Sequence, residues 1–278
     1  MKHPVILDAC TIINLLRIDE EDEFLFKSLM SLDLNIASIV YEEVNDNIKK
    51  NSLSDEQKKY IEQVIPLFLP FSRQNNDIIK DISQEFFDKL CGFSNHNKRH
   101  NGELLSSALS LCISREKNSK VYFYADDFPA KKQFAPYFLY QQIGAIGDSV
   151  DLLLFLYWAK SDFNEKHLKK CLQDLKSEYN IPLKQLVSKI QIKKDSFSKK
   201  DKTDKKLIEN MDKILHGYLQ SNSQLMIEGV SFFNESSKYP EIKRIIKQFP
   251  DMDKECLLSN KVQYVINSLS SYNIFKIA

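Results

Sequence analysis

Near its beginning, the chain of 278 residues reads Val5-Ile-Leu-Asp-Ala-Cys-Thr-Ile-Ile-Asn-Leu-Leu16. The apolar run from Val5 to Leu7 is typical of a buried parallel strand, and Asp8 follows at its carboxyl end. From Thr11 to Ile18, apolar residues recur at helical spacing. We therefore expect a strand and then a helix, with a carboxylate at the junction between them.

The same alternation continues along the first half of the chain. Leu34 to Val40 and Val121 to Ala125 are predicted strands, and a shorter strand is expected within Gln141 to Gly147. Helical patterns lie between them, which favours an α/β fold with a mostly parallel sheet flanked by helices. Ile65 to Phe71, with its two prolines, is predicted as a short edge strand. Asn76 to Cys91 is predicted as a single amphipathic helix.

The second half has a different composition, and we expect two domains, residues 1–160 and 161–278. Helices are predicted over Glu165–Tyr179 and Leu183–Ile192. The run from Lys193 to Lys206 is rich in Lys, Asp and Ser and is predicted to be a linker or mobile loop. The remaining residues show helical patterns, so the second domain is expected to be a Lys-rich segment followed by an α-helical region.

Composition excludes several classes of protein. Apolar residues make up 43% of the chain and charged residues 28%, which excludes global disorder. The net charge is +1, which alone predicts no polyanionic partner. No apolar run reaches about 18 residues, so no membrane-spanning segment is expected. The five cysteines form no Cys-x-x-Cys pair, so neither a zinc site nor a disulfide framework is predicted, and we expect a cytoplasmic protein.

Four acidic residues occupy positions where a parallel sheet places its chemistry. Asp8 and Asp126 follow predicted strands, Glu43 lies on the helix after the second strand, and Glu103 lies in the first turn of a helix behind Gly102. Each of these acids alone is equally well explained as a helix cap or a first-turn charge. Together they predict a cluster whose repulsion a divalent cation would relieve, and oxygen ligands suit Mg²⁺ or Mn²⁺.

Five segments, in this order, resemble the sequence motifs of PIN-domain nucleases. They are the strand and helix of Val5–Leu16, the strand and helix start of Ile36–Val44, the Gly-Glu helix of Gly102–Leu111, the strand and paired acids of Val121–Lys131, and the glycine-containing strand Ile143–Gly147. The resemblance covers roughly residues 1–160. It implies a three-layer PIN-like fold in which a mostly parallel sheet lies between helices.

The resemblance also implies the residues of the site. The catalytic and metal-binding acids would be Asp8, Glu43, Glu103 and Asp126. Glu42 remains an alternative to Glu43, and Asp127 an alternative or additional metal ligand beside Asp126. The chain departs from the family at Cys10, where a small hydroxyl residue is common, and Thr11 is a candidate to supply the hydroxyl instead. Asp148, where Thr is frequent, is interpreted as a helix cap in preference to an extra acid of the site.

Thr11 and basic residues near these acids are candidates for binding the substrate. Arg99 lies in a polar loop before Glu103, where a solvated loop is the simpler interpretation. Lys131 and Lys132 follow the paired aspartates, and the matching family position is often basic.

The function implied by the resemblance is a Mg²⁺- or Mn²⁺-dependent endoribonuclease, toxin-like or defence-linked. Such an enzyme would be restrained by an inhibitory or regulatory partner protein and would be able to form a homodimer. Two alternatives stay open, because the sequence does not distinguish RNA from DNA. One is a non-catalytic RNA-binding or scaffolding protein with the same fold, and the other is a nuclease that cleaves DNA.

Overall fold

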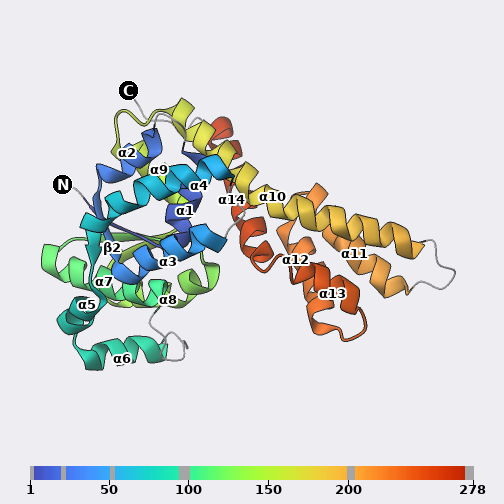
Figure 1. Ribbon diagram of the computed structural model, residues 1–278, viewed down its shortest axis with the longest axis horizontal. Coiled ribbons are helices and arrows are strands. Elements are labelled where there is room, and N and C mark those ends of the chain that lie inside the picture. Colours follow the sequence, from blue (N-terminus) through green and yellow to red (C-terminus); the bar gives the residue numbers. More distant parts are fainter. Residues whose placement is uncertain (1–2, 20–22, 51–53, 94–100, 199–203, 273–278) are drawn as a thin grey trace. The chain divides into compact units, whose positions relative to one another are not determined.

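The chain divides into two compact units, Met1–Cys171 and Leu172–Ala278, which are drawn in Figure 1. The division falls inside one helix, whereas the sequence pattern places the end of the first domain at about residue 160. The structure is a computed structural model that describes residues 3–19, 23–50, 54–93, 101–198 and 204–272.

The first unit is an α/β fold built on five parallel strands in the order β3-β2-β1-β4-β5. These are β1 (Pro4–Leu7), β2 (Asp33–Ala37), β3 (Ser72–Arg73), β4 (Val121–Tyr124) and β5 (Gly144–Gly147). In the central strand β1, Val5 stands opposite Leu34 on one side and Tyr122 on the other. All of β1 is buried, as expected for a strand covered on both faces. The prediction of an α/β fold with a mostly parallel sheet is confirmed.

Helices cover this sheet on both sides. They are α1 (Ala9–Ile18), α2 (Phe24–Met30), α3 (Ser38–Lys50), α4 (Asp55–Val64), α5 (Asn75–Ile82), α6 (Gln84–Phe93), α7 (Gly102–Lys117), α8 (Phe128–Tyr140) and α9 (Ser149–Ala159), with a 3-10 helix, η1 (Ile65–Phe71). The long helix α7 packs against β1, β2 and β4, while α9 packs against β4, β5 and α1 (Figure 1). α7 is buried almost all round, so its core faces include serines as well as apolar residues.

Prolines explain one local difference from the sequence prediction. The predicted edge strand over Ile65–Phe71 is wrong, because this segment forms η1. Pro66 lies in the first turn of η1, where a missing N–H is tolerated, and neither Pro66 nor Pro70 can donate to a strand ladder. The edge strand that does form, β3, has two residues, and the side chain of its Arg73 pairs with Asp81 and Glu116.

Two further differences concern helices of the first unit. The single helix predicted over Asn76–Cys91 is wrong, because α5 and α6 are separated at Ser83, whose φ is 66°. A backbone with positive φ cannot continue a right-handed helix, so the chain changes direction at Ser83 before α6 begins. The sequence pattern also does not predict α8, which contains Pro129 in its first turn and Pro136 in its interior.

The second unit is helical, and a single long helix leads into it. The helices are α10 (Glu165–Ser198), which begins in the first unit, α11 (Lys205–Leu219), α12 (Ser223–Glu235), α13 (Pro240–Ile246) and α14 (Met252–Tyr272). α10 continues through Pro182, so the two separate helices predicted there are in fact one. Among the residues that the structure describes, no helix is long and apolar enough to cross a membrane.

The predicted linker from Lys193 to Lys206 is also wrong for the part that the structure describes. Residues 193–198 belong to α10 and residues 205–206 to α11, while 199–203 lie outside the described ranges. Lys193 pairs with Glu241 at 2.8 Å, and Lys194 pairs with Asp212. These lysines therefore bind neighbouring helices of the same unit.

The helices of the second unit share one apolar core, and α11 and α12 approach each other closely within it. The core contains Leu186, Met211, Ile214, Met226 and Phe233, all almost fully buried. At Gly229 on α12, an added Cβ would lie 2.8 Å from the backbone oxygen of Asn210 on α11. A side chain at position 229 would therefore push the two helices apart.

Gly229→Ala is expected to lower the free energy of unfolding by about 1–3 kcal/mol, because overpacking against backbone cannot be relieved by a side-chain rotation. Urea unfolding of the full chain, followed by circular dichroism, measures this loss. Gly92→Ala is the matched control, because nothing lies within 4 Å of a Cβ at that position. Equal stability of the two variants would contradict the close approach.

Candidate functional site

Asp8 is the buried acid at the centre of the candidate site. It follows β1, caps the N-terminus of α1, and is 1% exposed. Its Oδ2 accepts a hydrogen bond from the Cys10 amide at 3.3 Å, while its own amide donates to the Tyr124 carbonyl at 2.9 Å. Its Oδ1 is buried with no hydrogen-bond partner among the described residues. A buried carboxylate oxygen without a donor is costly, and such atoms are often explained by a bound ion or water.

Glu43, on α3, is held beside Asp8 by the N-terminus of α7. The Gly102 amide donates to Glu43 Oε1 at 3.1 Å, and Asn101 caps α7 by accepting from the Leu104 amide at 2.9 Å. A Cβ on Gly102 would clash with Glu43 Oε2 and lie 3.2 Å from Asp8 Oδ1. Two carboxylate oxygens therefore face one small space that is open only because residue 102 is glycine.

Electrostatic repulsion links Asp8 and Glu43 to a third acid, Glu103. The pKa of Asp8 is raised well above its ordinary value, first by burial and then by the charges of Glu103 and Glu43. The pKa of Glu43 is also raised, by burial and then by Glu103, against the opposing effect of the Gly102 amide. Three of the four predicted acids, Asp8, Glu43 and Glu103, are therefore linked by electrostatic repulsion.

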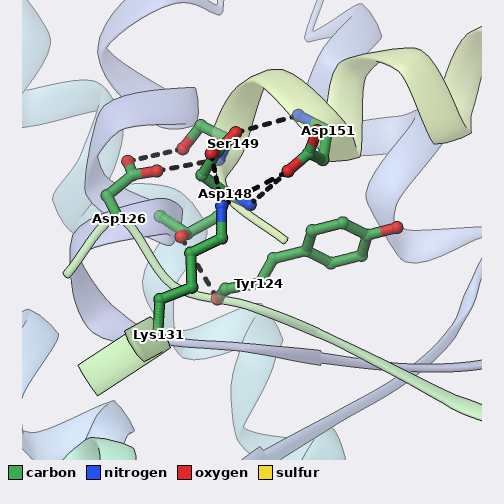
Figure 2. Close-up of polar contacts among 7 residues, drawn as sticks. Tyr124, Asp126, Lys131, Asp148, Ser149 and Asp151 are labelled. Carbon is green, nitrogen blue, oxygen red and sulfur yellow. Dashed lines mark hydrogen bonds and ion pairs between the residues drawn. The ribbon is translucent and has the colours of Figure 1, made fainter. Parts of the chain in front are cut away.

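Asp126, the fourth predicted acid, lies after β4 in an adjoining hydrogen-bond network (Figure 2). It is 1% exposed. Its Oδ1 accepts from the Ser149 amide at 2.8 Å, and its Oδ2 accepts from the Ser149 hydroxyl and from Asn14 Nδ2, both at 2.6 Å. Asn14 belongs to α1, the helix that Asp8 caps, so α1 connects Asp126 with Asp8.

The structure distinguishes the acids that the sequence left as alternatives. Glu42 is exposed, whereas Glu43 is half-buried and bound to the Gly102 amide. Asp127 is the N-cap of α8, where its carboxylate accepts from the Ala130 amide at 3.2 Å. Glu43 and Asp126 are therefore the acids that the fold directs into this part of the molecule.

The remaining predicted site residues differ in the contacts that they make. The Thr11 hydroxyl donates to the Tyr124 carbonyl at 3.2 Å, so the expectation that it serves Asp8 is wrong. Asp148 caps α9 in a capping box with Asp151, which confirms its interpretation as a cap. Lys131 pairs with both of these acids, and Lys132 is exposed on α8. Arg99 lies outside the described residues.

The chemistry of Asp8 and Glu43 suits a hard divalent cation. Within the described ranges, no group of three or more His, Cys, Asp or Glu side chains is arranged to hold a metal ion. Mg²⁺, however, is commonly held by one or two carboxylates together with water and substrate oxygens. The paired oxygens beside Gly102, Asp8 Oδ1 and Glu43 Oε2, provide two such ligands, and no described residue donates a hydrogen bond to Asp8 Oδ1.

Sequence reasoning missed Asn14 and Ser149, whose side chains donate hydrogen bonds to Asp126. Asn14 is the polar residue within the apolar run Ile12-Ile-Asn-Leu-Leu16, and a polar side chain on a buried helix face requires a hydrogen-bond partner. Ser149 directly follows the cap Asp148, which places its amide at an open helix N-terminus. Both signals are visible in the sequence, but neither identifies the partner.

Comparisons with known proteins give no assignment for this site. No family model matches the chain, and no curated protein or solved structure matches it either.

In EDTA, Asp8→Asn is expected to raise the free energy of unfolding by about 1 kcal/mol, because it removes a buried charge that Glu43 and Glu103 repel. Thermal and urea unfolding at neutral pH measure the change. Asp33→Asn is the control, because Asp33 is paired with Lys117 at 2.6 Å and its neutralisation brings no such relief. A loss of stability for Asp8→Asn would show that Asp8 is not under repulsion.

Proposed function

We propose that the protein is a Mg²⁺- or Mn²⁺-dependent endoribonuclease and that its first unit is a PIN-like nuclease domain. The observation that carries the proposal is the pair of oxygens, Asp8 Oδ1 and Glu43 Oε2, that face one space beside Gly102. Buried carboxylates gathered without a structural need for them are typical of functional sites.

The placement of the five PIN-like motifs supports the fold part of the proposal. In chain order they fall on β1 and α1, on β2 and α3, on α7, on β4 and α8, and on β5. Each acid-bearing motif is thereby placed at the end of a strand or the start of a helix, and the strands are parallel. This placement of the motif segments around one parallel sheet supports the proposal of a PIN-like fold for the first unit.

In the proposed mechanism, Asp8 and Glu43 would hold the cation, with the charge of Glu103 acting on both acids, and the cation would supply positive charge that stabilises the transition state of phosphodiester hydrolysis. Asp8 presents a carboxylate oxygen that accepts no hydrogen bond from any described residue, and the Gly102 amide orients Glu43. Asn14 and Ser149 fix the orientation of Asp126 beside these acids. Hydrolysis by water would leave 5′-phosphate and 3′-hydroxyl ends, whereas a cyclic phosphate product would contradict this mechanism.

Other parts of the proposal depend on the PIN resemblance alone. They are the choice of RNA as substrate, a toxin-like or defence-linked role, a cytoplasmic location, restraint by an inhibitory or regulatory protein, and a homodimer.

Purified full-length protein is expected to cut labelled RNA in Mn²⁺ or Mg²⁺ and not in EDTA. Glu43→Gln and Asp8→Asn should each lower the rate at least about 100-fold, because each removes a charged ligand of the cation. Glu42→Gln is the matched control for Glu43→Gln, since the exposed neighbour should retain the wild-type rate.

The same assay distinguishes the alternatives. Cutting of single- or double-stranded DNA in place of RNA would identify a DNA nuclease. RNA binding without cutting, by a folded protein in Mn²⁺, would identify a non-catalytic RNA-binding protein. Equal losses in Glu42→Gln and Glu43→Gln would contradict the assigned site.

Gly102→Ala tests the cation site independently of catalysis. The added methyl group would displace the Glu43 carboxylate, so the affinity for Mn²⁺, measured by isothermal titration calorimetry, should fall at least about tenfold. Stability in EDTA should change little, because a carboxylate can rotate away and alanine is the better helix former. Gly92→Ala is again the control, and unchanged Mn²⁺ affinity in Gly102→Ala would exclude a cation at this position.

A further inference from the structure

Lys131 is engaged with the N-terminus of α9 through two acidic side chains (Figure 2). Its Nζ lies 2.6 Å from Asp148 Oδ2 and 3.5 Å from Asp151 Oδ2. It also lies 5.6 Å from the centre of the Phe128 ring, on its own helix α8. The Lys131 side chain is 21% exposed, so solvent screens these contacts only partly.

The acids that Lys131 contacts form the capping box of α9. Asp148 accepts from the Asp151 amide, and Asp151 accepts from the Asp148 amide, both at 3.1 Å. Asp148 is 1% exposed, and two carboxylates within one helical turn repel each other. The Lys131 ammonium stands between them and offsets this repulsion. Lys131, which belongs to another helix, therefore contacts both acids of the first turn of α9.

The next residue, Ser149, links the N-terminus of α9 to Asp126 through hydrogen bonds. Ser149 is fully buried and holds both oxygens of Asp126, one through its amide and one through its hydroxyl. Because Ser149 is bonded directly to Asp148, a shift of the cap would move both donors. A chain of contacts thus leads from Lys131 through Asp148 and Ser149 to Asp126.

We propose that Lys131 is a positioning residue, which fixes the N-terminus of α9 so that Ser149 holds Asp126 in its functional orientation. The proposal concerns the role of Lys131 in the site and rests on the proposed nuclease function. It replaces the expectation that Lys131 binds substrate phosphate, because its ammonium is already directed at two carboxylates. Lys132, the exposed neighbour, lacks this arrangement and is the matched comparison.

The first experiment does not require catalysis. Hydrogen exchange of the Ser149 amide, followed by NMR on the full-length protein, reports directly on the bond to Asp126. Lys131→Met is expected to accelerate this exchange at least about tenfold relative to the amides of β1. Lys131→Arg should restore most of the protection, since it keeps the charge, and Lys132→Met should match the wild type. Unchanged Ser149 exchange in Lys131→Met would overturn the proposal.

The second experiment separates positioning from phosphate binding. A positioning role predicts that Lys131→Met lowers kcat about tenfold or more with KM for RNA unchanged, and that Lys131→Arg recovers much of the rate. A higher KM with unchanged kcat, together with normal Ser149 exchange, would assign Lys131 to the substrate. If wild-type protein cuts no nucleic acid, the nuclease function fails, while Ser149 exchange still decides whether Lys131 controls the bond to Asp126.

Discussion

Asp8 and Asp126 lie near each other because β1 and β4 are hydrogen-bonded neighbours that run in the same direction. Leu7 is paired with Tyr124, so both strands end at the carboxyl-terminal side of the sheet. There the Asp8 amide donates a hydrogen bond to the Tyr124 carbonyl. In an antiparallel pair these two strand ends would lie at opposite edges. The other parts of the site lie beside these strand ends. Helix α3 contributes Glu43, and helix α7 contributes Gly102 and Glu103.

Repulsion among the acids at these strand ends opposes folding, and local features of the chain reduce this loss of stability. The N-terminus of α7 provides the Gly102 amide for Glu43, and the N-terminus of α9 provides the Ser149 amide for Asp126. Amides at helix N-termini favour negative charge because of their orientation and the helix dipole. Asp8 receives less support, since one of its oxygens has no donor among the described residues. A local loss of stability of this kind is typical of functional sites.

Features encoded by short-range patterns could be predicted from the sequence. The strand ending at Leu7, the helix after it and the cap at Asp148 each follow from a few adjacent residues. The selection of Glu43 over Glu42 depends on which side of α3 faces Gly102, a residue far away in the chain. The partners of Asn14 and Lys131 likewise depend on tertiary packing. Proline led to two opposite errors. Pro66 lies in a 3-10 helix where the sequence pattern predicts a strand, and Pro182 lies inside the continuous helix α10 where the pattern predicts a break between two helices.

The short edge strand β3 limits how this sheet can associate with other molecules. An edge strand exposes unpaired N–H and C=O groups, and a long flat edge can add a strand from another chain and lead to aggregation. β3 has only two residues, and its Arg73 is held by acids from α5 and α7. Two residues offer too few backbone hydrogen bonds to dock a foreign strand, and η1 precedes them directly with prolines. On this side, the sheet is protected against growth by strand addition.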